Sequence, residues 1–186
     1  MGSRSSKKHP FFLFTIGHST RPIDEFLALL KENHVSLLVD VRTIPKSRHN
    51  PQYWGTTLEV SLSEVGIGYQ HISELGGLRK PQKDSHNTGW RNRSFHGYAD
   101  YMETKEFEAA LKELIGLAKA EIVVIMCAEA VPWRCHRNLI ADVLTVRGYK
   151  IGHIMGIGKV TEHKITSWAT VRGKHLIYAP LPEAIV

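Results

Sequence analysis

Five short segments of this chain are predicted as strands, and segments with helical periodicity lie between most of them. Four of these segments are largely apolar, at residues 11–16 (FFLFTI), 36–41 (SLLVDV), 121–126 (EIVVIM) and 150–155 (KIGHIM), and the other is at residues 68–72 (GYQHI). Strands that are apolar throughout are typical of a parallel sheet, because such a sheet is covered on both faces. Strands that alternate with helices form right-handed crossovers. We therefore predict an α/β fold with a mostly parallel open sheet of about five strands and helices on both faces, doubly wound and Rossmann-like.

Helical periodicity predicts where the chain crosses between these strands. The predicted helices occupy residues 22–33, about 58–65, 98–119 and 132–146. Apolar residues at three- and four-residue spacing mark the buried face of the first helix, and Ser19 or Thr20 is expected to cap it. The polar segment 78–97 has no periodicity, so we predict a long loop there. Residues 175–179 (HLIYA) are expected to add an edge strand.

The length and composition of the chain limit its class. Its 186 residues fit one domain, over residues 11–186, and residues 1–10 are expected to be a disordered leader or a cloning remnant. No apolar run approaches the roughly 20 residues that span a bilayer, and no signal peptide is recognisable, so we expect a cytoplasmic protein with no membrane partner. A formal net charge of +6 favours an anionic ligand such as a nucleotide, DNA or RNA. The sequence specifies no cofactor and no oligomeric state.

Polar and small residues follow the predicted strands. They form five groups, at residues 17–19 (GHS), 40–42 (DVR), 74–77 (ELGG), 127–129 (CAE) and 156–159 (GIGK). Parallel strands joined by right-handed crossovers have all their carboxyl ends at one edge of the sheet, and ligands bind at that edge. We therefore predict that these groups contribute to a single site.

The segment 127–137 (CAEAVPWRCHR) holds both cysteines of the chain. Cys135 is expected in the first turn of the helix 132–146, where the helix dipole and neighbouring basic side chains favour a thiolate. Cys127 lies at the strand end and can approach Cys135 across the loop. Two cysteines in a reducing compartment indicate thiol chemistry or buried packing rather than a disulfide framework. A metal site is disfavoured, because the spacing of the cysteines is not that of a compact zinc site.

Two basic segments also carry aromatic residues. Arg48 precedes Tyr53 and Trp54, and Trp90 lies close to Arg93. Arginine beside aromatic rings suits phosphate contacts combined with base stacking. The alternative is a pair of solvated loops whose aromatic residues cover the core.

Six ordered motifs resemble the domain of unknown function 488 family, and the resemblance covers about residues 12–158. They are residues 16–19 (IGHS), 39–42 (VDVR), 47–51 (SRHNP), 75–77 (LGG), 95–99 (FHGYA), and 127–129 (CAE) together with 135–137 (CHR). The resemblance implies a prokaryotic-type α/β domain with a shared polar site. It implies no reaction, since the family is named for lacking one.

Our leading hypothesis is a cytoplasmic enzyme that acts on a nucleotide or nucleic acid through a cysteine-containing site at the carboxyl edge of the sheet. The candidate catalytic residues are Cys127, Glu129, Cys135, His136 and His18. The candidate substrate-binding residues are Ser19, Asp40, Arg42, Arg48, Tyr53, Gly76, Gly77 and Arg137. For Asp40, ion pairing with an arginine is the favoured role. The alternatives are a non-catalytic nucleic-acid-binding module and, less favoured, a thiol redox or metal-binding protein.

Overall fold

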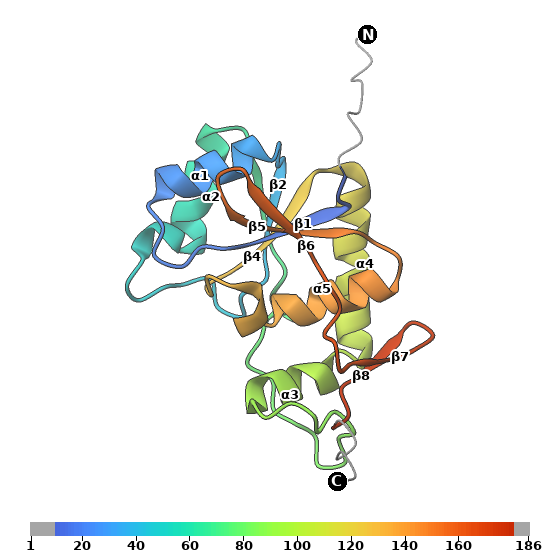
Figure 1. Ribbon diagram of the computed structural model, residues 1–186. Helices are drawn as coiled ribbons and strands as arrows, with labels where there is room; N and C mark the ends of the chain where they lie inside the picture. The colour runs from blue at the N-terminus through green and yellow to red at the C-terminus, as the bar shows by residue number, and fades with distance from the viewer. Residues whose placement is uncertain (1–9, 181–186) are drawn as a thin grey trace.

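A six-stranded sheet forms the centre of the computed structural model, which describes residues 10–180 (Figure 1). The strands are β1 (Leu13–Gly17), β2 (Leu37–Asp40), β3 (Gly68–His71), β4 (Val123–Cys127), β5 (Ile151–Gly156) and β6 (Lys159–Glu162). Their order is β3-β2-β4-β1-β5-β6, and all pairs are parallel except β5 with β6. The predicted α/β fold with a mostly parallel open sheet is confirmed. The added strand β6 was not predicted.

Helices cover both faces of the sheet, as Figure 1 shows. Helices α1 (Ile23–Glu32) and α2 (Gly55–Glu64) pack on one face. Helices α4 (Lys105–Ala120) and α5 (Arg137–Val146) pack on the other. Successive side chains of a strand point to opposite faces, so the fully buried residues of β4 divide between two cores. This alternation explains why β4 is apolar throughout.

The predicted single helix at residues 98–119 is wrong, because two helices with separate caps replace it. Helix α3 (Arg93–Tyr101) begins inside the segment predicted as a loop, and the Asn92 side chain accepts hydrogen bonds from the first turn. Helix α4 then begins after Thr104, whose hydroxyl accepts from the backbone N–H of Phe107. Each cap satisfies backbone donors that a continuous helix would have paired internally.

The rest of the segment 78–97 is a loop, and its attachment to Asp100 orders it. The Asp100 carboxylate accepts from the backbone N–H of Gln82, the hydroxyl of Ser85 and the amide of Asn87. Asn87 is itself buried, and its carbonyl oxygen accepts from the backbone N–H of Tyr178. These bonds join the loop to α3 and to the C-terminal segment.

Three predicted helix and strand positions are corrected. The first helix is not capped by Ser19 or Thr20, because the extended Pro22 occupies the position before it. The last helix begins at Arg137, after a separate short turn of 3-10 helix, η3 (Pro132–Arg134). The predicted edge strand is β8 (His175–Ile177), which pairs with β7 (Thr170–Arg172) in a second sheet instead of extending the first.

The expected leader at residues 1–10 lies outside the described residues except for Pro10. Within residues 10–180, none of the helices combines the length and the apolar character that crossing a bilayer requires.

Candidate functional site

The carboxyl ends of the parallel strands meet at one edge of the sheet, as predicted. Gly17 at the end of β1 is in register with Cys127 at the end of β4, and Asp40 of β2 is in register with Met126. Beyond the strands, the backbone N–H of His18 donates to the Cys127 carbonyl oxygen at 3.0 Å. A side chain on Gly17 would overlap the backbone oxygen of Glu129, so only glycine allows the cysteine loop to lie this close to β1.

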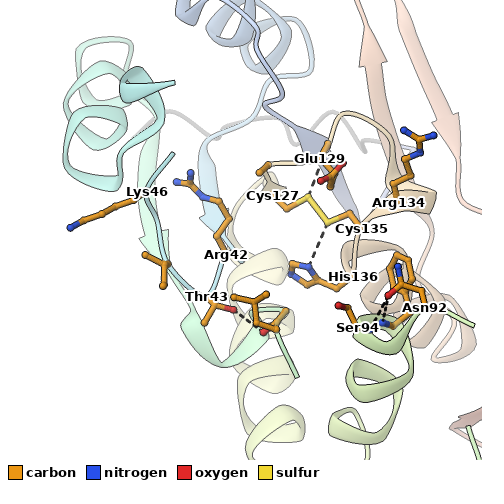
Figure 2. A pocket seen from close by; sticks show the side chains of 15 residues that line it. Arg42, Thr43, Lys46, Asn92, Ser94, Cys127, Glu129, Arg134, Cys135 and His136 are labelled. Atoms are coloured by element: carbon orange, nitrogen blue, oxygen red, sulfur yellow. Dashed lines mark hydrogen bonds between the residues drawn. A yellow bond between two sulfur atoms is a disulfide. The ribbon is translucent and has the colours of Figure 1, made fainter. Parts of the chain in front are cut away.

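A pocket of about 410 Å³ opens at this edge and joins Cys127 to Arg42 (Figure 2). Figure 2 shows Arg42, Thr43 and Lys46 on one side of the cysteines and Asn92 and Ser94 on another. The lining residues are Arg42, Thr43, Ile44, Lys46, Gly77, Leu78, Asn92, Ser94, Phe95, Cys127, Ala128, Glu129, Arg134, Cys135 and His136. Residues from two of the predicted groups, 40–42 and 127–129, therefore line the same pocket.

A disulfide joins Cys127 to Cys135 in the wall of the pocket (Figure 2). The sequence indicated thiol chemistry or buried packing instead of a disulfide, and the structure corrects this expectation. It also corrects the position of Cys135, which has an extended backbone and precedes α5 instead of lying in its first turn. The turn η3 folds the loop back toward β4, so the two cysteines, 2% and 4% exposed, meet across it.

His136 lies beside the sulfur of Cys135. Its Nε2 is 2.8 Å from the backbone oxygen of Val41, and a carbonyl oxygen only accepts, so Nε2 carries the proton. Its Nδ1 lies 3.6 Å from the Cys135 sulfur (Figure 2). Burial, with smaller contributions from nearby Arg137 and Arg79, lowers the pKa of the His136 imidazole to about 4. The ring is therefore neutral near pH 7, with a free lone pair facing the sulfur.

Arg137 lies beside the other sulfur. Its guanidinium donates through Nη1 to Cys127 Sγ and to the Glu129 carbonyl oxygen, and through Nη2 to the Ala130 carbonyl oxygen at 3.1 Å. The side chain is 1% exposed, and among residues 10–180 its buried Nε has no hydrogen-bond partner. Burial lowers the pKa of Arg137 to about 9. The guanidinium therefore faces the sulfur from within the protein and not from the open pocket.

Asp40 and Arg42 form a buried ion pair, the role favoured for Asp40. The Arg42 Nη2 lies 2.6 Å from Asp40 Oδ2, and its Nε lies 2.9 Å from Oδ1. The Tyr69 hydroxyl also donates to Oδ2 at 3.0 Å. Next to the pair, His18 donates from Nδ1 to the Ser19 carbonyl oxygen and stacks on Tyr53. Burial lowers the pKa of His18 to about 4, so its Nε2 accepts from Arg42.

The remaining candidate residues divide between the pocket and its supports. Gly77 and the exposed Glu129 line the pocket. Tyr53 is fully buried and its hydroxyl donates to the Arg21 carbonyl oxygen, so its ring packs inside the protein. A side chain on Gly76 would overlap Thr43, so Gly76 shapes the wall from behind. Ser19 and Arg48 are not among the residues that line this pocket.

Several lining residues were not among the sequence candidates. They are Thr43, Ile44, Lys46, Leu78, Asn92, Ser94, Phe95, Ala128 and Arg134. Asn92 carried a usable signal, because Asn is a favoured residue before the first turn of a helix. The others come from loops, from the first turn of α3 and from η3, which only the fold brings together. Within residues 10–180, no three His, Cys, Asp or Glu residues gather as a set of metal ligands.

Comparison with known proteins identifies the family but no relative of known activity. Residues 22–144 match the family described as Domain of unknown function DUF488. This range holds more than half of the chain and includes every motif of the resemblance except the glycine motif at residues 16–19. The chain matches no curated protein and no solved structure.

Proposed function

The chain belongs to the DUF488 family, whose description names no reaction, and from its own geometry we propose that it is a thiol–disulfide redox enzyme. The observation that supports this most directly is the joined pair Cys127 and Cys135 in the wall of a pocket. Arg137 contacts one sulfur and His136 the other, so a charged donor and a neutral base accompany the pair.

The proposed reaction exchanges one disulfide for another. The reduced protein, with both thiols free, attacks a small disulfide R–S–S–R, breaks its S–S bond and forms the Cys127–Cys135 bond. The substrate gains two electrons and two protons and leaves as two R–SH molecules, while the protein loses the same number. An external thiol or dithiol then reduces the protein disulfide for the next turnover.

The charges around the pocket favour an anionic substrate. Arg42, Lys46 and Arg134 line it, and Glu129 is the acidic lining residue. Because Asp40 already pairs with Arg42, the exposed Lys46 and Arg134 supply the free positive charge at the rim. We therefore propose a small disulfide that bears carboxylate or phosphate groups.

A single-turnover experiment tests this function. Chemically reduced protein, freed of reductant, is mixed with one equivalent of oxidised glutathione, an anionic disulfide, and followed by intact mass spectrometry and thiol titration. We expect the chain to lose two hydrogens without a lasting adduct and two glutathione thiols to appear. A Cys135→Ser variant is expected to stop as a mixed disulfide with glutathione.

Two comparisons make the result decisive. Cystamine, a cationic disulfide, is expected to react several-fold more slowly than oxidised glutathione, since the rim is basic. The urea-unfolded protein gives the rate of the same two cysteines without a folded pocket. Folded protein that stays reduced while the unfolded chain is oxidised would rule out the proposed redox function.

A nucleotide or nucleic-acid ligand is the second candidate, supported by the net charge of +6 and the basic pocket rim. The support from aromatic residues is smaller than the sequence indicated. Tyr53 is fully buried, and Trp90 packs against Trp168 and Tyr178. Trp54, which is 44% exposed, remains as a stacking surface.

A thermal-shift series with nucleotides and a DNA or RNA retardation series test this candidate. A ligand that binds the folded state raises the melting temperature, and retardation through phosphate contacts weakens steeply with added salt. Absence of both effects at low salt would end the nucleic-acid proposal without affecting the redox one.

A further inference from the structure

Arg137 is a buried cation, and its hydrogen-bond acceptors among the described residues are neutral in the oxidised protein. Within residues 10–180, no carboxylate lies within ion-pair distance of its guanidinium. Two backbone oxygens and Cys127 Sγ accept its hydrogen bonds, while Glu129 attracts it only through longer-range electrostatics. A desolvated charge is stabilised most by an opposite charge in direct contact. In the reduced protein the Cys127 sulfur is the atom in position to carry that charge.

The environment of Cys135 differs in kind. Its sulfur faces the unprotonated Nδ1 of His136, while Nε2–H of the same ring is held by the Val41 carbonyl oxygen. The backbone bond therefore sets the tautomer, and the neutral ring can accept a proton but not donate one to this sulfur. A reduced Cys135 beside it is therefore a thiol whose S–H can donate a hydrogen bond to Nδ1, and not a stored thiolate.

We infer that the two cysteines have different roles. Cys127 is the attacking thiolate, stabilised by Arg137, and Cys135 is the resolving thiol, oriented by His136. This inference rests on the proposed redox function and adds the order of its steps. Cys127 Sγ attacks one substrate sulfur, forming a mixed disulfide and releasing the first R–S⁻. His136 Nδ1 accepts the hydrogen bond of the Cys135 S–H and so orients this thiol as Cys135 Sγ attacks Cys127 Sγ, which releases the second R–S⁻. The proton that Cys135 loses and one proton from solvent complete the two R–SH thiols.

Single-cysteine variants isolate each sulfur for measurement. Cys135→Ser retains only Cys127, and Cys127→Ser retains only Cys135, so neither can form the internal disulfide. The alkylation rate with iodoacetamide, a small neutral reagent, is measured against pH after reduction. We expect Cys127 to titrate at least about one pH unit below an ordinary thiol near 8.5, and Cys135 at or above that value.

Arg137→Met in the Cys135→Ser background tests the source of the difference. Loss of the guanidinium is expected to slow alkylation of Cys127 at about pH 6.5 by roughly 10-fold or more, because the thiolate fraction falls tenfold per pKa unit. Arg147→Met in the same background is the matched control. Arg147 is also largely buried at the other end of α5, but it pairs with Glu108, and its loss should leave the titration of Cys127 unchanged.

The outcomes separate this inference from the redox function. A Cys127 that titrates no lower than Cys135 overturns the inference, and this comparison holds even if Arg137→Met fails to fold. An equal effect of Arg137→Met and Arg147→Met also overturns it. If the wild-type chain turns over a disulfide but the pKa of Cys127 is not lowered, the assigned roles are wrong and the redox function stands. If the pKa of Cys127 is lowered but the chain exchanges no disulfide, the redox function is wrong.

Discussion

The buried pair of Asp40 and Arg42 gives the sharpest prediction about stability. Replacement of Asp40 by Asn keeps the shape of the side chain, so it opens no cavity, but it removes the charge. Arg42, 6% exposed, then remains charged with only neutral acceptors such as the Tyr53 carbonyl oxygen. Loss of one partner from a buried ion pair typically destabilises a protein by about 3–5 kcal/mol. We expect Asp40→Asn to lower the free energy of unfolding by that amount.

Urea unfolding at neutral pH measures this loss, and a double-mutant cycle assigns it. For a chain of this size, a loss of about 3–5 kcal/mol lowers the melting temperature by roughly 6–20 °C. Arg42→Met alone leaves Asp40 unpaired and is also destabilising. The double variant leaves no buried charge at this position. We therefore expect its loss in free energy of unfolding to be smaller than the sum of the two single losses by about 1–3 kcal/mol.

An exposed pair provides the control. Lys150 and Glu162 lie 2.9 Å apart, but their side chains are 50% and 55% exposed. Glu162→Gln is therefore expected to change stability by at most about 1 kcal/mol. A loss from Asp40→Asn no larger than that from Glu162→Gln, or additive single losses in the cycle, would refute the argument that burial makes the Asp40–Arg42 pair important.

Two further predictions concern acid and the cysteine loop. Burial lowers the pKa values of His18 and His136 to about 4, so the unfolded chain binds more protons than the folded chain between about pH 6.5 and 4. The stability contribution should be complete above this window, and the free energy of unfolding should fall by roughly 1 kcal/mol per pH unit per histidine within it. Urea unfolding at about pH 7 and about pH 5 measures this fall, and equal stability at both would contradict it. Gly17→Ala places a methyl group against the backbone oxygen of Glu129, so we expect the cysteine loop to shift. The free energy of unfolding should fall by about 1–3 kcal/mol, and the alkylation rate of Cys127 in the reduced protein should change. Gly116 is exposed and no atom lies within contact of a methyl group added there, so Gly116→Ala should show neither the loss nor the changed rate.

The predicted elements that are confirmed depend on local patterns. The fully buried residues of β4 alternate between two cores, and this requirement appears in the sequence as an uninterrupted apolar run. The errors arise where a side chain competes with the backbone pattern. Thr104 caps α4 in the middle of a continuous helical periodicity, and Asn92 starts α3 within a polar segment. Neither cap changes the spacing of apolar residues, so periodicity alone misses both.

The candidate site also has a part that local patterns predict and a part that they do not. Its position was predictable, because parallel strands with crossovers place residues 17–19, 40–42 and 127–129 at one edge. Ion pairing of Asp40 with an arginine was also favoured beforehand. The disulfide and the partner of each sulfur were not predictable. They depend on η3 and on the start of α5 at Arg137, both of which differ from the predicted helix.

The sequence by itself determined the layers of the fold and the edge where the site lies, because burial periodicity and crossover handedness act over short distances along the chain. Only the tertiary structure decided which polar groups meet there. Val41 sets the tautomer of His136 from 95 residues away. Gly17 leaves room for the cysteine loop, which lies far from it in the sequence. Such contacts are decided when distant segments pack together, and hydrogen-bond partners of this kind leave no periodic trace in the sequence.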